Sequence, residues 1–527
     1  MSNVQRTSLV TDSSSLGDRV ASGIVGLGVL VFVASWLLLF RWVSPETDVF
    51  GVSLFQALGL CLVLMAVGIL ALGVASTTGA IETDPSNTAG LVTGVLFGLL
   101  GLLTGGLVTS PLLGLGGVGW ILGAFVVGVG AAAVSVLPDE DIGSTVPAGV
   151  FLLLLGGVFA TGLVGAGWSW SPANLSVTLI APVAVPALAV VGSLVGVWSA
   201  AKARAGFGAR GRQRGAFLLV GVSVFGMLAV LALLVGFIVV NGLDTLLTDA
   251  TVGGSGLVSI PFLMNVSQSL YVDVPGVLPA IMGTLWLVVG AMTFAVPLGI
   301  GAAVFLTEYA EDGRFTQLVE IATNGLWSTP SIVFGLFGLA FLLPRVSNGS
   351  RSLLGGQLVL GFMLLPLVVI TSRESIKAVP DEYRDASAAL GVTKWQTIKS
   401  VVLPAAMPGV ITGVILGVGR IAGETAPLLL TFGGPPFANS TPDVLGSFEF
   451  SLAPPFVTNE ALMTAGSALP YQLYTSITSG RLPGQGAPFS VQEFGWGTAL
   501  VLLLVVLGLY AIGIGSRLYF RRKLYHE

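Results

Sequence analysis

Residues 378–408 read AVPDEYRDASAALGVTKWQTIKSVVLPAAMP, and the organisation of the chain can be worked out from this segment. The segment is polar, but apolar runs at about 353–372 and 405–432 lie on both sides of it. Each run has about the 20 residues that a helix needs to cross the hydrocarbon core of a membrane. The segment is therefore expected to connect two membrane spans.

The first part of the segment has the pattern of a short amphipathic helix. A helix start is predicted at Asp381, which follows a proline. Tyr383, Ala386 and Leu390 recur at helical spacing. Gly391 is suited to the left-handed conformation that ends many helices. A short helix followed by a glycine turn is therefore expected.

A second short helix is predicted directly afterwards. Thr393 and Gln396 have the spacing of a capping box. Trp395 and Ile398 belong to an apolar face, and Pro404 is expected to end the helix. The two helices predict a compact knob at the membrane surface, hereafter the knob. A linker that lies along the surface is the alternative.

The composition of the whole chain is that of a membrane protein. Of 527 residues, 54% are hydrophobic and 9% are charged, and the mean hydropathy is +0.94. Typical soluble domains have about 25% charged residues, so a soluble or disordered chain is excluded. The only cysteine is Cys61 and the only histidine is His526. A disulfide framework, a cysteine-based metal site and a histidine-centred active site are therefore not expected.

The apolar runs predict about twelve transmembrane helices and an all-α fold. They lie at about 20–40, 52–75, 89–109, 111–136, 147–167, 175–200, 216–240, 279–306, 317–343, 353–372, 405–432 and 497–518. The span count within 89–136 stays open, because this region is rich in glycine and only Pro111 divides it.

A basic segment separates the first six spans from the last six. Residues 202–215 contain five basic residues and no acid, which predicts a cytoplasmic linker by the positive-inside rule. This divides the chain into an extension at 1–201 and a core at 216–527. Counting from the linker places 373–404 and both termini in the cytoplasm. It places the loops 241–278 and 433–496 outside.

Two charges fall deep within the run at 405–432. Arg420 and Glu424 are four residues apart, so they are expected on one helix face. Each costs roughly 2.5–3.5 kcal/mol at the bilayer centre, and such residues by default line a bundle interior or a water-filled path. Thr425 offers a further hydrogen-bond donor, and Pro427 is expected to bend the helix. The pair predicts either a path for oxyanions, which suit the planar fork of arginine, or an ion pair that only orients helices.

The knob segment resembles the EAA loop in the permease subunits of importing ABC transporters. That loop has Glu-Ala-Ala, three residues, Gly, nine residues and Ile-x-Leu-Pro. At the same spacing this chain has Asp385-Ala386-Ser387, Gly391 and Val401-Val402-Leu403-Pro404. The resemblance implies that a groove on an ATPase subunit receives the loop, with coupling through Asp385, Ala386, Ser387, Gly391, Leu403 and Pro404.

No nucleotide site is expected in this chain. The sequence contains no Gly-x4-Gly-Lys-Ser/Thr pattern, which is the loop that holds phosphates in many ATPases. The chain is therefore interpreted as a permease and not an enzyme, with ATP and Mg bound to a separate ATP-binding subunit.

The tract around the two buried charges resembles the signature of phosphate-uptake permeases, Arg-x-x-Gly-Glu-Thr-Ala-Pro. Here it is formed by Arg420, Gly423, Glu424, Thr425, Ala426 and Pro427. Sulfate and molybdate permeases share only its first part. Leu469-Pro470-Tyr471-Gln472-Leu473-Tyr474 resembles a late periplasmic segment of the PstA-type subunit rather than its PstC-type partner. The resemblance covers about 216–527.

The resemblance implies the permease core of a type I ABC importer in the cytoplasmic membrane. The implied partners are an ATP-binding subunit, a PstC-type second permease subunit, an extracytoplasmic phosphate-binding protein and the lipid bilayer. Arg420, Glu424 and Thr425 are then expected along the path of phosphate. Import of another oxyanion (sulfate, molybdate or tungstate) and an ion-coupled secondary transporter remain as alternatives. The extension at 1–201 is expected to be a structural or regulatory module.

Overall fold

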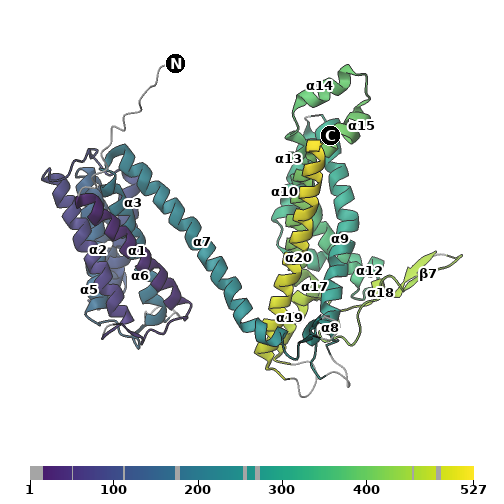
Figure 1. Ribbon diagram of the computed structural model, residues 1–527, viewed down its shortest axis with the longest axis horizontal. Coiled ribbons are helices and arrows are strands. Elements are labelled where there is room, and N and C mark those ends of the chain that lie inside the picture. Colours follow the sequence, from purple (N-terminus) through teal and green to yellow (C-terminus); the bar gives the residue numbers. More distant parts are fainter. Residues whose placement is uncertain are drawn as a thin grey trace. The chain divides into compact units, whose positions relative to one another are not determined.

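The computed structural model describes residues 16–49, 51–110, 113–171, 178–252, 258–267, 273–311, 313–453, 456–481 and 488–526. In these ranges eleven helices are long and apolar enough to cross a membrane, or twelve if a sharply bent pair counts as one more span. This confirms the expected all-α membrane architecture (Figure 1). The chain divides into two compact units, Met1–Leu231 and Ala232–Glu527, and the division falls within helix α7 (Gly208–Leu246).

Unit 1 is a bundle of antiparallel apolar helices. Its elements are α1 (Leu16–Leu39), β1 (Asp48–Val49), β2 (Val52–Ser53), α2 (Leu54–Thr77), α3 (Leu91–Thr109), α4 (Val118–Val136), α5 (Glu140–Ala160), β3 (Ser169–Trp170), β4 (Leu179–Ile180), α6 (Ala181–Arg204) and the first part of α7. β1 pairs with β2 and β3 with β4, both antiparallel. The region 89–136 therefore contains two helices; Pro111 lies outside the described residues.

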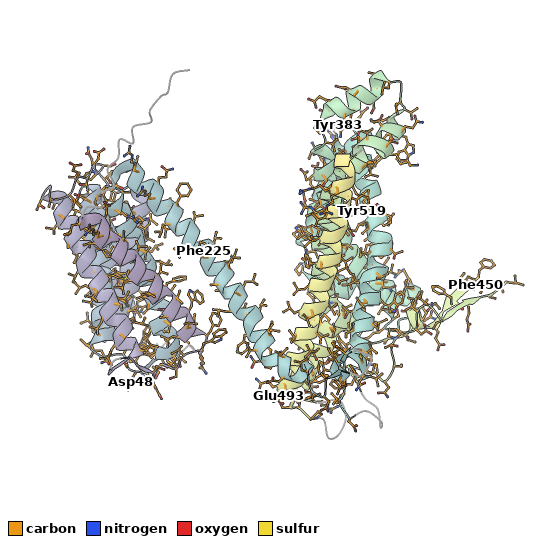
Figure 2. The ribbon with its side chains drawn as sticks, viewed as in Figure 1. Asp48, Phe225, Tyr383, Phe450, Glu493 and Tyr519 are labelled. Carbon is orange, nitrogen blue, oxygen red and sulfur yellow. The ribbon has the colours of Figure 1, made fainter. Side chains whose placement is uncertain are left out.

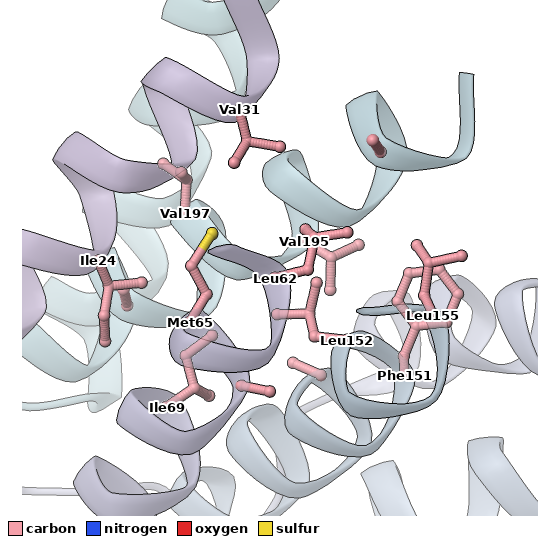
Figure 3. Close-up of a cluster of buried hydrophobic side chains, with 14 of the residues drawn as sticks. Ile24, Val31, Leu62, Met65, Ile69, Phe151, Leu152, Leu155, Val195 and Val197 are labelled. Carbon is pink, nitrogen blue, oxygen red and sulfur yellow. The ribbon is translucent and has the colours of Figure 1, made fainter. Parts of the chain in front are cut away.

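The core of unit 1 lies where α2 packs between α1, α5 and α6 (Figure 3). Leu62, Met65 and Ile69 of α2 have no exposed surface. Gly59 lets α2 approach α5 closely, because a Cβ there would lie 2.4 Å from the backbone nitrogen of Ala160. Small residues at such contacts are the usual means by which membrane helices pack.

One end of unit 1 contains a buried ion cluster that the sequence reading missed. Glu140 is fully buried and pairs with Lys202 at 2.8 Å and with Arg212 at 2.9 Å. The backbone N–H of Gly208 also donates to Glu140, at 3.0 Å. The residues predicted as a linker are thus mostly helical, since α6 ends at Arg204 and α7 begins at Gly208. Lys202 and Arg212 hold this helix turn onto the start of α5.

Glu140→Ala is expected to destabilise unit 1 by roughly 3–5 kcal/mol, because the buried ammonium of Lys202 would lose its counter-ion. Thermal unfolding of the full chain in detergent measures this. The double variant Glu140→Gln with Lys202→Met removes both charges and should unfold at a higher temperature than Glu140→Ala. An unchanged melting temperature in Glu140→Ala would contradict the assignment.

Unit 2 is built around α13. Its elements are the rest of α7, β5 (Thr251–Val252), β6 (Val258–Ser259), α8 (Pro261–Met264), α9 (Leu278–Val304), η1 (Phe305–Tyr309), α10 (Arg314–Ser328), α11 (Ser331–Phe337), η2 (Gly338–Leu342), α12 (Leu343–Val346), α13 (Leu353–Lys377), α14 (Asp381–Ala389), α15 (Lys394–Thr397), η3 (Ile398–Val402), α16 (Leu403–Ala422), α17 (Ala426–Thr431), β7 (Phe448–Phe450), β8 (Val457–Asn459), α18 (Glu460–Met463), α19 (Leu469–Ser479) and α20 (Val491–His526). α13 packs against α9, α10, α16 and α17. β5 pairs with β6 and β7 with β8, both antiparallel.

The two ends of unit 2 differ in what they carry (Figure 1). α14, α15 and the C-terminal end of α20 lie at one end, and α8 and α19 lie at the other. The β7–β8 hairpin leaves the bundle, and Phe450 near its tip is 81% exposed (Figure 2). The arrangement places the knob and the C-terminal end of α20 on the same side of unit 2.

The predicted span at 317–343 is sharply bent rather than straight. The helix direction changes by 103° between α10 and the helical run from Ser331 to Val346. Thr329 between them is extended, with φ −69° and ψ 132°, because the ring of Pro330 disfavours the α conformation in the residue before it. The bend ends α10 at Ser328, one residue after Trp327.

The prediction that Pro404 ends the second knob helix is wrong. α15 continues through the π-helical turn η3 into α16. In this turn the N–H of Leu403 donates to the carbonyl of Ile398, five residues earlier. A regular α-helix would bring the proline ring against the carbonyl four residues before it, and the wider π turn relieves that clash. The knob is therefore joined to α16 by continuous helix.

Candidate functional site

Arg420 and Glu424 lie at a break between two helices. α16 ends at Ala422 and α17 begins at Ala426, so the two charges do not share a continuous helix, contrary to the prediction. Gly423 follows the last residue of α16, and glycine is a poor helix former. Pro427 fits the first turn of a new helix, because its missing N–H needs no partner there. Pro427 thus helps to start α17 instead of bending a longer helix.

The break still brings the two charges together. Arg420 Nε lies 3.7 Å from Glu424 Oε1. The guanidinium carbon of Arg420 also lies 4.4 Å from the centre of the Trp327 ring on α10, a cation–π contact. The side chain of Arg420 is 35% exposed and that of Glu424 17%. Trp327 is a site residue that sequence reasoning missed.

The Arg420 guanidinium retains unused donors. Among the described residues, no acceptor lies within hydrogen-bond distance of it, and its ion pair with Glu424 is long. A guanidinium can donate two parallel hydrogen bonds to one oxyanion. Thr425 stands at the N-cap of α17 without a side-chain capping bond, so its hydroxyl is available nearby. The site has the chemistry to bind a tetrahedral anion.

The far end of α17 is held by two side chains from other elements. Arg351 Nη1 donates to the carbonyl of Gly433 at 2.9 Å, and the hydroxyl of Tyr471 donates to the carbonyl of Gly434 at 2.6 Å. Burial raises the pKa of Tyr471, and the Arg351 charge partly offsets this. The hydroxyl therefore stays protonated at neutral pH and keeps its donor role.

The knob has the local structure that its sequence predicts. Gly391 has φ +73°, in the left-handed region. Thr393 and Gln396 form a complete capping box at the start of α15. These local signals are read correctly because they depend only on residues a few positions apart.

The exposed side of the knob is unusually apolar for a polar segment. Leu390 is 82% exposed and Trp395 58%, and Tyr383 is also exposed (Figure 2). Trp395 thus lies on the surface, whereas Ile398 is buried against unit 2. Of the predicted coupling residues, Asp385, Ala386 and Gly391 are exposed, Leu403 and Pro404 are half-buried, and Ser387 is buried.

Arg384 anchors the knob to the bundle, and sequence reasoning did not single it out. Its Nη2 lies 2.8 Å from Oε1 of Glu308 on η1, and its Nε lies 3.2 Å from the same oxygen. It also donates to the carbonyls of Val379 and Ile376 and to Asp381. The signal available in the sequence was Glu308, a carboxylate next to an apolar span, which needs a partner.

A second contact between η1 and the knob lies beside the first. Lys394 Nζ lies 5.1 Å from the ring centre of Tyr309. The knob is therefore attached to η1, at the end of α9, through Arg384 and Lys394, and to α16 through the backbone. Within the described ranges, no group of three or more metal-binding side chains occurs.

The family match of this chain lies in unit 2. Residues 295–524 match a family described as "Binding-protein-dependent transport system inner membrane component". The chain is 30% identical over 303 residues to "Probable ABC transporter permease protein YqgI" of Bacillus subtilis, covering 56% of this chain and 94% of the relative. It is 36% identical over 231 residues to "Phosphate transport system permease protein PstA 1" of Mycobacterium tuberculosis, covering 44% of this chain and 67% of the relative. Among solved structures, it is similar to an inward-facing form of the MetNI methionine ABC transporter, with 16% identity and a TM-score of 0.34. The match covers 46% of this chain and 94% of that chain.

Proposed function

The chain belongs to the PstA-type permeases of ABC transport systems, and from that premise we propose that it carries inorganic phosphate into the cell. The observation that supports an anionic substrate is Arg420, whose guanidinium lies beside Trp327 with unused donors. The relatives' names support phosphate as that anion. Arg420, Glu424 and Thr425 would bind or guard phosphate on its way through the membrane. Glu424 would hold Arg420 when no phosphate is present.

Transport would be driven by ATP and would proceed by alternating access. The knob would dock into a groove on an ATP-binding subunit, which binds ATP and Mg. Its exposed Leu390 and Trp395 would supply apolar surface for such a contact. Closure of the ATPase would move the knob, and the Arg384–Glu308 pair would pass that motion to α9.

The remaining partners follow from the same proposal. A PstC-type second permease subunit would complete the path, and an extracytoplasmic phosphate-binding protein would deliver phosphate to the loops 241–278 and 433–496. The chain is a multi-span protein of the cytoplasmic membrane, and both termini would face the cytoplasm. The C-terminal end of α20 lies at the knob end of unit 2, which supports this orientation (Figure 1). The extension would serve a structural or regulatory role.

Uptake of radiolabelled phosphate tests the substrate. Cells lacking their own phosphate import and expressing the whole transporter should take up phosphate, and unlabelled phosphate should compete much better than sulfate, molybdate or tungstate. Stronger competition by one of these anions would overturn phosphate as substrate. An ATP-binding subunit should co-purify with the chain; uptake without any such subunit would favour a secondary transporter.

A further inference from the structure

A second group of charges lines a cavity at the knob end of unit 2, between α10 and α13. The cavity has a volume of about 240 Å³, against the roughly 10–15 Å³ that one water molecule needs. Its polar lining consists of Glu320, Thr323, Asn324, Arg373, Glu374 and Lys377. It is large enough for a hydrated ion. Two cations and the amide of Asn324 line it as donors, together with two carboxylates, whereas the hydroxyl of Thr323 donates to the carbonyl of Val319 at 2.7 Å.

Arg373 is the best-placed cation in this cavity. Its Nη1 pairs with Oε1 of Glu320, and its side chain is only 15% exposed. Its Nε is buried and, among the described residues, has no hydrogen-bond partner. A buried donor without a partner is unfavourable, so the guanidinium can donate a further hydrogen bond to an oxygen of a ligand. A lone structural ion pair would not require that free donor.

The cavity lies on the same face of α10 as the Arg420 site. Glu320, Thr323 and Trp327 are spaced three and four residues apart, which places them on one face of the helix. Seven residues separate Glu320 from Trp327, a rise of about 10 Å. Arg420 contacts Trp327 at one end of this face, and Arg373 contacts Glu320 at the other.

From this geometry we infer a second oxyanion site, in which Arg373 binds the anion between the Arg420 site and the cytoplasm. Glu320 is its displaceable counter-ion, as Glu424 is for Arg420. The inference rests on the proposed function, since it assigns a second station to the same transported phosphate. Its role is to receive phosphate from the Arg420 site, so that the anion leaves one guanidinium for another along α10.

Protection of an introduced cysteine tests whether the anion binds there. The only native cysteine of this chain is Cys61, so in Cys61→Ser with Thr323→Cys the labelling of this subunit reports on this cavity alone. In the solubilised whole transporter, inorganic phosphate should slow alkylation of the new cysteine about tenfold or more, as expected for a charge-assisted contact. Adding Arg373→Gln should abolish the protection. Gln317→Cys, on an exposed part of α10, should react equally with and without phosphate.

Uptake kinetics supply a second measurement. Loss of a purely structural ion pair would not lower the maximal rate while leaving the half-saturation concentration unchanged. Arg373→Gln should lower the maximal rate of phosphate uptake about tenfold or more, with the external half-saturation concentration unchanged. Full rescue by the reversed pair Arg373→Glu with Glu320→Arg would show a structural pair and overturn the inference. So would the absence of phosphate protection in a wild-type background that takes up phosphate. Failure of the wild-type transporter to import phosphate would instead overturn the proposed function.

Discussion

Arg420→Gln is expected to reduce phosphate uptake at least about a hundredfold, because it removes the charged fork that would bind the anion. The guanidinium carbon lies 4.4 Å from the centre of the Trp327 ring, and Nε lies 3.7 Å from Oε1 of Glu424. The remaining N–H donors are available for the anion. Glutamine keeps a donor but neither the charge nor the bidentate geometry. Initial rates of radiolabelled phosphate uptake by cells expressing the whole transporter measure the effect.

Two further variants separate anion binding from a structural ion pair at this position. Arg420→Lys keeps the charge but loses the fork, so its rate is expected to lie between those of wild type and Arg420→Gln. The reversed pair Arg420→Glu with Glu424→Arg is expected to stay inactive, since the cation no longer faces Trp327. Restored uptake in the reversed pair would mean that the two charges serve only to orient helices.

Arg384→Gln is expected to uncouple ATP hydrolysis from transport. The side chain bonds to Glu308, which is 8% exposed, and to two carbonyls at the base of the knob. Breaking such a buried pair costs roughly 3–5 kcal/mol, enough to let the knob move without α9. Uptake should fall at least about tenfold, while the ATP-binding subunit still co-purifies and still hydrolyses ATP.

Two further variants test this role of Arg384, one at its ion-pair partner Glu308 and one on the same helix. Glu308→Gln should reproduce the uncoupling, because it removes the other half of the pair. Glu382→Gln is the matched control: Glu382 is an exposed carboxylate of α14 outside this network, and uptake should remain near the wild-type rate. Loss of the ATP-binding subunit from Arg384→Gln would instead indicate that Arg384 acts in docking.

The knob and the Arg420 site differ in how far the sequence could predict them. Gly391 and the Thr393–Gln396 capping box were predictable, because their conformations follow from neighbouring residues. The contact of Arg420 with Trp327 was not, since 93 positions separate the two residues. The break after Ala422 does not follow from the i, i+4 spacing of Arg420 and Glu424, because that spacing fits a continuous helix as well as a broken one.

The apolar runs, the glycine turn and the position of each charge along the chain establish the membrane spans and the knob. These features are local, and hydrophobic length and helix capping act within a few residues or a single helix. The partners of Glu140, Glu308 and Glu320, and the contact of Arg420 with Trp327, became known only from the packed helices. A charged side chain in an apolar bundle needs an opposite charge close by, but the sequence contains several opposite charges for each one. Helix packing selects among them, because it sets which faces meet and at what depth.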